Sequence, residues 1–360
     1  MVFDSEATNL VLSDWNFQPD IFVHDLTTGH TTRVSVDSNG LESDGISGWG
    51  PSTISANGRY VAFDSSATNL VANDTEGNKD VFVHDRMTRT TIRVSVSSQG
   101  FQGNNYSYYS DISEDGNVVA FRSTASNLVP NDTNGEWDTF VHDIPTGRTT
   151  RVSVDSAGLE ANDSSLECRL SGDGRWVAFK SEASNLVPGD TNGAPDIFLH
   201  DRNTGITNRV STRSVGSEGD FSSTQPSISS DGSLVGFVGR SMDLVPYDQN
   251  RHDDIFIHDR FGPTLQKFGL CPGGITLVVS SDAPGQAVAM FFGPAGSFVQ
   301  ATPPCQGVEL GIGQPQFGGL AVTNSLGVAP FPFVAPPGAC GLRVQAVDLN
   351  TCTTTNVMEL

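Results

Sequence analysis

Few basic residues and no long apolar run limit what this chain can do. Of its 360 residues, 20 are Lys or Arg and 41 are Asp or Glu, which gives a formal net charge of -21. A field of this sign repels nucleic acid and anionic membrane surfaces, and it attracts metal ions or basic partners. No apolar run approaches the roughly 18 residues that a membrane-spanning helix needs. We therefore expect neither nucleic-acid binding nor membrane insertion.

Several catalytic motifs are also missing. The sequence contains no G-x-S-x-G elbow, no H-E-x-x-H zinc motif and no phosphate-binding loop. Runs of helix-forming residues are rare, whereas 38 glycines accompany abundant Ser, Thr and Asn. This composition predicts an all-β protein, and the length allows two domains.

Cysteine is nearly absent outside the last 90 residues, since Cys168 is the only one before them. The other four form no C-x-x-C pair and no zinc-finger spacing: Cys271, Cys305, Cys340 and Cys352. We predict two disulfides formed in an oxidising compartment, with three connectivities open, and free buried thiols as the alternative. The chain begins inside a repeat, because residues 2–10 match residues 62–70. We therefore expect an N-terminally truncated chain with its export signal upstream, and a secreted, cell-surface or periplasmic location.

A 13-residue segment that ends in F-(V/L/I)-H-D returns five times. The copies end at Asp25, Asp85, Asp143, Asp201 and Asp259, at intervals of 60, 58, 58 and 58 residues. Each copy follows one order: a short apolar strand, a tight Asp-Gly or Asn-Gly turn, a V-A-F strand, a long polar loop, the FVHD strand, a short turn and TTRVSV. The first copy begins at its second strand. Up to about residue 268, the chain is therefore one four-stranded unit repeated.

The side-chain pattern predicts how these strands are covered. Apolar residues on both faces of the FVHD strand indicate that it is buried on both sides. In the TTRVSV strand, Val34 and Val36 alternate with Arg33 and Ser35. We expect the two valines to face the core and the other two residues to face solvent.

Four-stranded antiparallel units of constant length, strung in series, are what a β-propeller requires. The pattern S-x-D-G-x-x-V-A-F … D-I-F-V-x-D resembles the TolB-like propellers built from WD-like repeats. The resemblance covers residues 1–268 and implies five visible blades of about 58 residues, the first incomplete. A further blade upstream would complete the ring, or residues 277–292, which echo a blade hairpin, would close it. Such propellers serve as binding scaffolds and as appendages to enzymes, so the fold leaves the function open.

Residues 269–360 predict a second domain. Short strands at spacings of 8 to 12 residues, separated by Pro- and Gly-containing turns, favour a small β-sandwich that the cysteines would stabilise. The segment resembles C-terminal sandwich modules that follow repeat regions in secreted bacterial proteins.

Loop lengths identify a candidate working face. The loops between strands two and three, and from strand four to the next blade, emerge on the same side and are about 14 residues long. We call this side the long-loop face. Its D-T-N-G-x-x-D segment resembles the calcium loops of other propellers, with the first acidic position missing. The predicted ligands are Asp74, Glu76 and Asp80; Asp132, Asn134 and Asp138; and Asp190, Asn192 and Asp196. The alternative is an Asx-turn network without metal.

Histidines and aromatic residues complete the candidates. The five histidines of the FVHD strands lie in five different blades, so they cannot converge on one ion and are interpreted as structural. Aromatic residues that differ between blades are the candidate ligand-binding residues: Trp15, Trp49, Tyr106, Tyr108, Tyr109, Trp137 and Tyr247. They would suit a sugar or a peptide, or else they pack the loops onto the blades.

These patterns favour a non-catalytic secreted or periplasmic scaffold that binds a protein, peptide or glycan on its long-loop face, with calcium possible as a stabiliser. One alternative is a propeller enzyme, a polysaccharide lyase or glycoside hydrolase, with its site near the axis. Another is a structural cell-surface protein. Non-repeated Arg, Tyr, His and Asp around the axis would favour an enzyme, whereas smooth repetition would favour a scaffold.

Overall fold

The computed structural model describes residues 1–75, 77–213, 217–242, 244 and 252–260 with their side chains, and strand backbone alone after residue 261. Contacts between Cα atoms divide the chain into two compact units. The first contains 1–211, 220–241 and 251–258, and the second contains 212–219, 242–250 and 259–360. Six predicted site residues lie outside the described residues: Glu76, Tyr247, Cys271, Cys305, Cys340 and Cys352.

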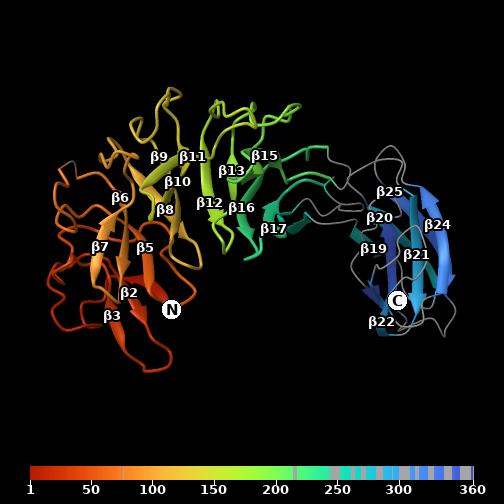
Figure 1. The fold of residues 1–360 in the computed structure, drawn as a ribbon, viewed down its shortest axis with the longest axis horizontal. Helices are drawn as coiled ribbons and strands as arrows, with labels where there is room; N and C mark the ends of the chain where they lie inside the picture. The colour runs from red at the N-terminus through yellow and green to blue at the C-terminus, as the bar shows by residue number, and fades with distance from the viewer. Residues whose placement is uncertain are drawn as a thin grey trace. The chain divides into compact units, whose positions relative to one another are not determined.

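Five antiparallel sheets follow one another along the first unit, coloured red to green in Figure 1. The first sheet has three strands: β1 (Val2–Ser5), β2 (Asp20–His24) and β3 (Thr31–Arg33). The second has four: β4 (Thr53–Ile54), β5 (Tyr60–Ser65), β6 (Asp80–Asp85) and β7 (Thr90–Arg93). The third has β8 (Ser107–Ile112), β9 (Val118–Ser123), β10 (Asp138–Asp143) and β11 (Arg148–Arg151).

The fourth and fifth sheets repeat this order. The fourth contains β12 (Ser165–Leu170), β13 (Trp176–Ser181), β14 (Asp196–Asp201) and β15 (Ile206–Arg209). The fifth contains β16 (Ser223–Ile228), β17 (Leu234–Gly239) and β18 (Asp254–Asp259). Neighbouring strands pair in chain order, so the predicted four-stranded blade is confirmed, and the first blade lacks its first strand as predicted.

Each blade is held by a pair of stacked phenylalanines, one from the V-A-F strand and one from the FVHD strand. In the third blade, Phe121 and Phe140 are fully buried with ring centroids 5.9 Å apart. Equivalent pairs are Phe3 and Phe22, Phe63 and Phe82, Phe179 and Phe198, and Phe237 and Phe256. Stacked aromatic pairs contribute about 0.5–1.5 kcal/mol beyond the area that they bury.

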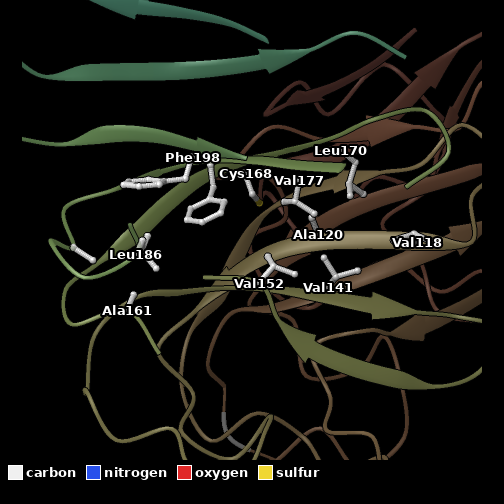
Figure 2. Close-up of a cluster of buried hydrophobic side chains, with 12 residues drawn as sticks. Val118, Ala120, Val141, Val152, Ala161, Cys168, Leu170, Val177, Leu186 and Phe198 are labelled. Atoms are coloured by element: carbon white, nitrogen blue, oxygen red, sulfur yellow. The ribbon is translucent and has the colours of Figure 1, made fainter. Parts of the chain in front are cut away.

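The core continues between neighbouring blades. Figure 2 shows Val141 and Val152 of the third blade beside Val177 and Phe198 of the fourth. In the first four blades the FVHD strand is buried along nearly its whole length, which confirms that it is covered on both sides there, whereas Ile255 and Ile257 of the fifth copy are exposed. Apolar side chains of successive blades therefore share a layer between the first and second, the second and third, and the third and fourth blades.

The FVHD histidines are structural in the four blades where their contacts are described. Each Nδ1 lies 2.9 Å from the Oγ1 of a threonine on the fourth strand, as in His142 and Thr149. In the second, third and fourth blades that hydroxyl in turn donates to a main-chain oxygen of the preceding blade, such as Val36 for Thr91. Burial lowers the pKa of His84 and of His200 to about 4, so these rings stay neutral.

The prediction that Arg33 and Ser35 face solvent is wrong. Ser35 is fully buried, and its hydroxyl donates to Asp20 Oδ1 at 2.5 Å. The Arg33 side chain is 8% exposed because three carboxylates surround it. An alternating pattern predicts that the polar face of a strand is exposed to solvent only where no loop covers that face. Here the long loops cover it.

The described backbone of the second unit contains nine strands in three sheets. They are β19 (Thr264–Phe268), β20 (Gly273–Ser280), β21 (Ala287–Gly293), β22 (Ala295–Val299), β23 (Glu309–Ile312), β24 (Gln316–Val322), β25 (Val328–Ala335), β26 (Arg343–Asp348) and β27 (Met358–Glu359). The sheet orders are β19-β20-β25, β24-β21-β26-β27 and β22-β23. Since β20 and β21 belong to different sheets, residues 277–292 do not form a blade hairpin. The sandwich and its boundary at residue 268 stay predictions.

Every regular element in the described residues is a strand. Within that part of the chain, no helix is long and apolar enough to cross a membrane.

Candidate functional site

The two long loops of a blade are joined to each other on the long-loop face. In the third blade, the D-T-N-G loop carries Thr133 and Asn134, and the following loop carries Glu160. The Thr133 main-chain N–H donates to Glu160 Oε2 at 3.1 Å, and Asn134 Nδ2 donates to the main-chain oxygen of Ala161 at 2.9 Å. These bonds place the predicted metal ligands beside the end of β11.

An arginine lies among the predicted ligands. Arg151 Nη1 is 2.8 Å from Glu160 Oε2, 3.0 Å from Asp138 Oδ2 and 3.7 Å from Asp132 Oδ1. Corresponding clusters recur in other blades, and we call them the arginine-centred clusters. The first blade has Arg33 with Asp14, Asp20 and Glu42; the second has Arg93 with Asp74 and Asp80; the fourth has Arg209 with Asp190 and Asp196.

The asparagines of these loops form Asx turns. Asn134 Oδ1 accepts a hydrogen bond from the Glu136 main-chain N–H at 2.9 Å, and its Nδ2 also points to Asp138 Oδ2 at 3.3 Å. Asn192 forms the same turn with Ala194 at 2.8 Å. The carbonyl oxygen that a cation would need is thus engaged with the loop. Metal binding by Asn134 and Asn192 stays a prediction.

Charge in the arginine-centred clusters is not balanced. The first, third and fourth blades each set three carboxylates against one guanidinium, with carboxylate oxygens within 4.8 Å of one another. Burial, followed by the charge of Asp138, raises the pKa of Asp132 to about 6. Burial likewise raises the pKa of Asp80 to about 6 and that of Asp14. Such groups could accept a cation or a proton, but the arginine already occupies part of the space that six to eight calcium ligands would require.

A second group of side chains lies at the long-loop ends of the first and second strands. Arg122 on β9 pairs directly across from Tyr108 on β8. The Arg122 guanidinium carbon lies 4.2 Å from the ring centroid of Tyr108, 4.6 Å from that of Tyr109 and 5.3 Å from that of Trp137. Tyr108 and Trp137 meet edge to face, with centroids 5.0 Å apart.

The group extends into the second blade through a lysine. Lys79 Nζ lies 3.7 Å from the ring centroid of Trp49 and 5.5 Å from that of Tyr108. Rings and cations thus alternate from Trp49 to Trp137, each cation held over aromatic faces. We call Trp49, Lys79, Tyr108, Tyr109, Arg122 and Trp137 the aromatic–cation cluster. It brings together four of the seven aromatic residues that the sequence nominated.

The aromatic–cation cluster departs from the repeat. The blade position of Arg122 is occupied in chain order by Asp4, Asp64, Arg122, Lys180 and Val238. By contrast, the arginine of the arginine-centred clusters is present in four successive blades. The cluster therefore supplies the non-repeated Arg and Tyr of the condition set above, and no histidine of the described residues takes part in it.

A β-bulge shapes the cluster. The pairing of β8 with β9 shifts between Tyr108 and Asp111, and Tyr109 has a φ of 65°. Glu167 and Gln225 occupy the same place in the next two blades, with φ values of 51° and 53°. A non-glycine residue in this left-handed region is uncommon, and bulges often redirect a side chain at a binding site. Here the bulge allows two consecutive tyrosines to contact one guanidinium.

Two carboxylates near the cluster are committed to main-chain groups. Asp64 is buried, and it accepts hydrogen bonds from the N–H groups of Trp49 at 3.1 Å and Gly50 at 2.9 Å. Asp111 accepts one from Leu170 N–H at 2.8 Å. Burial raises the pKa of both carboxyl groups. Their oxygens position the loop and strand backbones rather than pair with Arg122.

A pocket of about 580 Å³ adjoins Trp49 on its other side. Its lining includes Phe17, Trp49, Asp4, Glu6 and Gln18. Trp49 and Phe17 are 67% and 79% exposed, so both present free aromatic surface. Polar side chains beside exposed rings are the usual lining of a small-ligand site.

The remaining nominated aromatic residues lie apart from the cluster contacts. Trp15 is 72% exposed, and its main-chain N–H donates to Glu42 Oε2 at 3.0 Å. Tyr106 is 48% exposed and directly precedes β8. Their ligand-binding role stays a prediction.

Sequence inspection missed the cations of both regions. An arginine recurs at one position of the repeat, as Arg33, Arg93, Arg151 and Arg209. This recurrence could have predicted the arginine-centred clusters, because an arginine in an acidic repeat needs carboxylate neighbours. Arg122 and Lys79 show as departures from the repeat. Their contact with the rings depends on strand pairing and on the bulge, which the sequence does not reveal.

No protein-family model matches the sequence, and no curated protein matches it either. Among solved structures, a putative TolB from Agrobacterium tumefaciens is similar over 94% of this chain and 87% of its own, with 11% identity and a TM-score of 0.37. A prolyl endopeptidase is similar over 95% of this chain, which spans 46% of that protein, with 13% identity and a TM-score of 0.38. Kuenenia stuttgartiensis hydrazine synthase is similar over 95% of this chain and 77% of its own, with 11% identity and a TM-score of 0.34. Because all three TM-scores are below 0.5, the blade architecture rests on the strand order of this chain itself.

Proposed function

We propose that this protein is a non-catalytic propeller scaffold, secreted or periplasmic, that binds a glycan on its long-loop face. The aromatic–cation cluster and the adjoining pocket carry the proposal. Trp49 joins them, and its exposed ring faces solvent beside Lys79. Flat aromatic surfaces with a few oriented polar groups suit the apolar faces and hydroxyl groups of a sugar.

The carboxylates near the cluster support binding rather than catalysis. A glycosidase needs two carboxyl groups facing the scissile bond. Asp64 and Asp111 instead direct oxygens to main-chain N–H groups. A protein or peptide ligand remains the alternative within the same class, and a structural surface protein would bind neither.

A second candidate function is a polysaccharide lyase. The observation that favours it is the single, non-repeated grouping of Arg122, Tyr108 and Tyr109. In a β-elimination, the arginine would neutralise the sugar carboxylate and a tyrosinate would remove the C5 proton. A C4–C5 double bond would form as the C4–O glycosidic bond breaks, and the leaving oxygen would take up the proton. Such an enzyme would generate unsaturated sugar ends that absorb ultraviolet light, so steady absorbance in the presence of an acidic polysaccharide would exclude it.

Calcium is a finer proposal for the arginine-centred clusters of the first, third and fourth blades. The excess negative charge in these clusters supports it. A calcium ion there would stiffen the joined long loops, in competition with Arg33 and Arg151 for the same carboxylate oxygens.

The glycan proposal can be tested by screening immobilised oligosaccharides with the wild-type protein and Trp49→Ala. Because Trp49 is exposed, the substitution should leave the fold intact while lowering affinity for any captured oligosaccharide about 10-fold or more. Trp15→Ala is a matched control, since it removes an equally exposed tryptophan outside the cluster. Equal capture by Trp49→Ala and wild type would contradict the proposed site.

A further inference from the structure

Arg122 has no carboxylate partner. Among the described residues, its side chain forms no ion pair and no hydrogen bond, and its Nε is buried without a partner, as is the Nε of Arg151. Three aromatic rings hold the guanidinium instead. A guanidinium offers five N–H donors in a planar fork, so the group retains donors for a ligand.

Two other arginines of the chain that stack on aromatic rings do have carboxylate partners. Arg59 and Arg175 also stack on an aromatic ring, at 4.7 and 4.6 Å, but each forms two bonds with an aspartate of the FVHD strand. Arg151 is surrounded by carboxylates. In a chain with 41 acidic residues, a half-buried arginine over three rings and without a counter-ion indicates that an anion comes from outside.

Neighbouring cations strengthen the preference of this region for an anionic ligand. Lys79 lies on the other side of Tyr108, and Arg169 lies 6.0 Å from the ring of Tyr109, where its Nη1 donates to a main-chain oxygen. The nearby acids, Asp64, Asp111 and Glu167, each accept main-chain N–H bonds. At physiological salt the screening length is about 8 Å, so these close cations act on a bound anion more strongly than charges farther away.

We propose that Arg122 is a receptor for the carboxylate of an acidic sugar, so that the glycan bound at the aromatic–cation cluster contains uronate residues. This inference rests on the proposed glycan function and narrows its ligand class. The carboxylate pairs with the free edge of the guanidinium, which is the geometry in which arginine binds carboxylates best. The sugar rings contact the exposed faces of Trp49 and Trp137.

The bulges in the first strands of the blades favour a sugar ligand over an extended peptide. A peptide with acidic side chains would gain most by adding a strand to the open edge of β8. The bulge between Tyr108 and Asp111 interrupts the regular spacing of that strand, and bulges recur at the same place in β12 and β16. Bulged edges resist strand addition.

The test is calorimetric titration with two hexasaccharides that differ only in charge. Cellohexaose carries a hydroxymethyl group on each ring, and the β-1,4-linked hexamer of glucuronate carries a carboxylate at the same carbon. We expect the wild-type protein to bind the glucuronate hexamer at least 10-fold more tightly. Arg122→Gln should remove about 10- to 100-fold of that affinity, as expected for a charge-assisted hydrogen bond.

Two further variants separate binding from folding. Arg122→Lys keeps the charge but loses the fork, so its affinity should lie between those of wild type and Arg122→Gln. Arg59→Gln removes a ring-stacked arginine remote from the cluster and should leave the affinity unchanged. Circular dichroism melting curves confirm that each variant is folded before titration.

The outcomes distinguish this inference from the proposed function. Equal binding of both hexamers, unchanged in Arg122→Gln, would overturn the uronate inference and leave glycan binding intact. Binding of neither hexamer would contradict both. A hexaglutamate peptide bound as tightly as the glucuronate hexamer would show that the carboxylate receptor serves peptides, which also contradicts the proposal.

Discussion

Two arginines at the long-loop ends of one blade have opposite surroundings. Arg151 lies among three carboxylates, within a cluster whose arginine and two aspartates recur in four successive blades. Arg122 lies among three aromatic rings, in a grouping found in one blade. The repeated cluster joins the long loops of each blade, so it serves the scaffold. The aromatic–cation cluster occurs once, where the second and third blades meet, and the free donors of Arg122 point to a ligand.

The difference predicts which property each region controls. The arginine-centred clusters should determine stability and its dependence on pH, whereas the aromatic–cation cluster should determine binding. The second blade offers a natural intermediate, since Gln102 occupies the position that Glu42 and Glu160 hold in their blades. Gln102 Nε2 donates to Asp74 at 3.0 Å and to Asp80 at 2.9 Å, which removes one negative charge.

The largest loss of stability to unfolding is expected for Arg151→Gln. Loss of the guanidinium leaves Asp132, Asp138 and Glu160 buried or half-buried without compensation, and breaking a buried ion pair costs about 3–5 kcal/mol. Urea unfolding should show this loss at pH 7. Arg122→Gln, the matched control, should cost less than about 1 kcal/mol. Equal losses in the two variants would remove the distinction between the regions.

Asp132→Asn should stabilise the protein at alkaline pH. The pKa of Asp132 is raised to about 6 from 3.8, so its charge opposes folding above pH 6. A shift of this size corresponds to about 1–3 kcal/mol gained by the substitution at pH 8. The gain should shrink as the pH falls from 6 to 3.8, where wild-type Asp132 is protonated in both states. A gain that does not vary with pH would show that charge is not its cause.

The repeated fold could be predicted from the sequence because each repeat contains the strand and turn motifs of a blade. The FVHD strand, the V-A-F strand and the Asp-Gly turns recur at fixed spacing, and local periodicity determines them. The prediction that Arg33 and Ser35 face solvent is wrong because residues 14–20 and 42–43 of the long loops cover them. The sequence of a strand does not show which loops will cover it.

The site was only partly predictable. Aromatic residues that vary between blades identified Trp49, Tyr108, Tyr109 and Trp137. Their convergence on Arg122 requires the β8–β9 register and the left-handed backbone at Tyr109, and both depend on tertiary contacts. The calcium pattern pointed to the correct loops, but it could not reveal that an arginine on the fourth strand reaches the same carboxylates.

A smaller effect is expected for Gln102→Glu. The substitution copies the first and third blades into the second, replaces two hydrogen bonds with like-charge repulsion, and should cost about 1 kcal/mol at pH 8. The loss should be smaller at pH 5, where Asp80, with a pKa of about 6, is mostly protonated. Thermal unfolding at the two pH values measures it, and a pH-independent loss would contradict the charge imbalance.

The smallest effect is expected from removing calcium. Because Arg33 and Arg151 compete for the same oxygens, a chelator should lower the melting temperature of the wild-type protein by no more than about 2 °C. Arg151→Gln opens the cluster, so added calcium should raise its melting temperature more than that of wild type. An identical response of the two proteins would exclude a cation site at Asp132, Asp138 and Glu160.

Hydrogen exchange of the wild-type protein, with and without the glucuronate hexamer, tests the central claim most directly because it observes both regions at once. Our account predicts slower exchange at residues 106–109 and 122–124 in the presence of the hexamer, and no change at residues 157–161 of the arginine-centred cluster. Protection confined to residues 157–161, or none in either region at saturating hexamer, would contradict the assignment of binding to the aromatic–cation cluster.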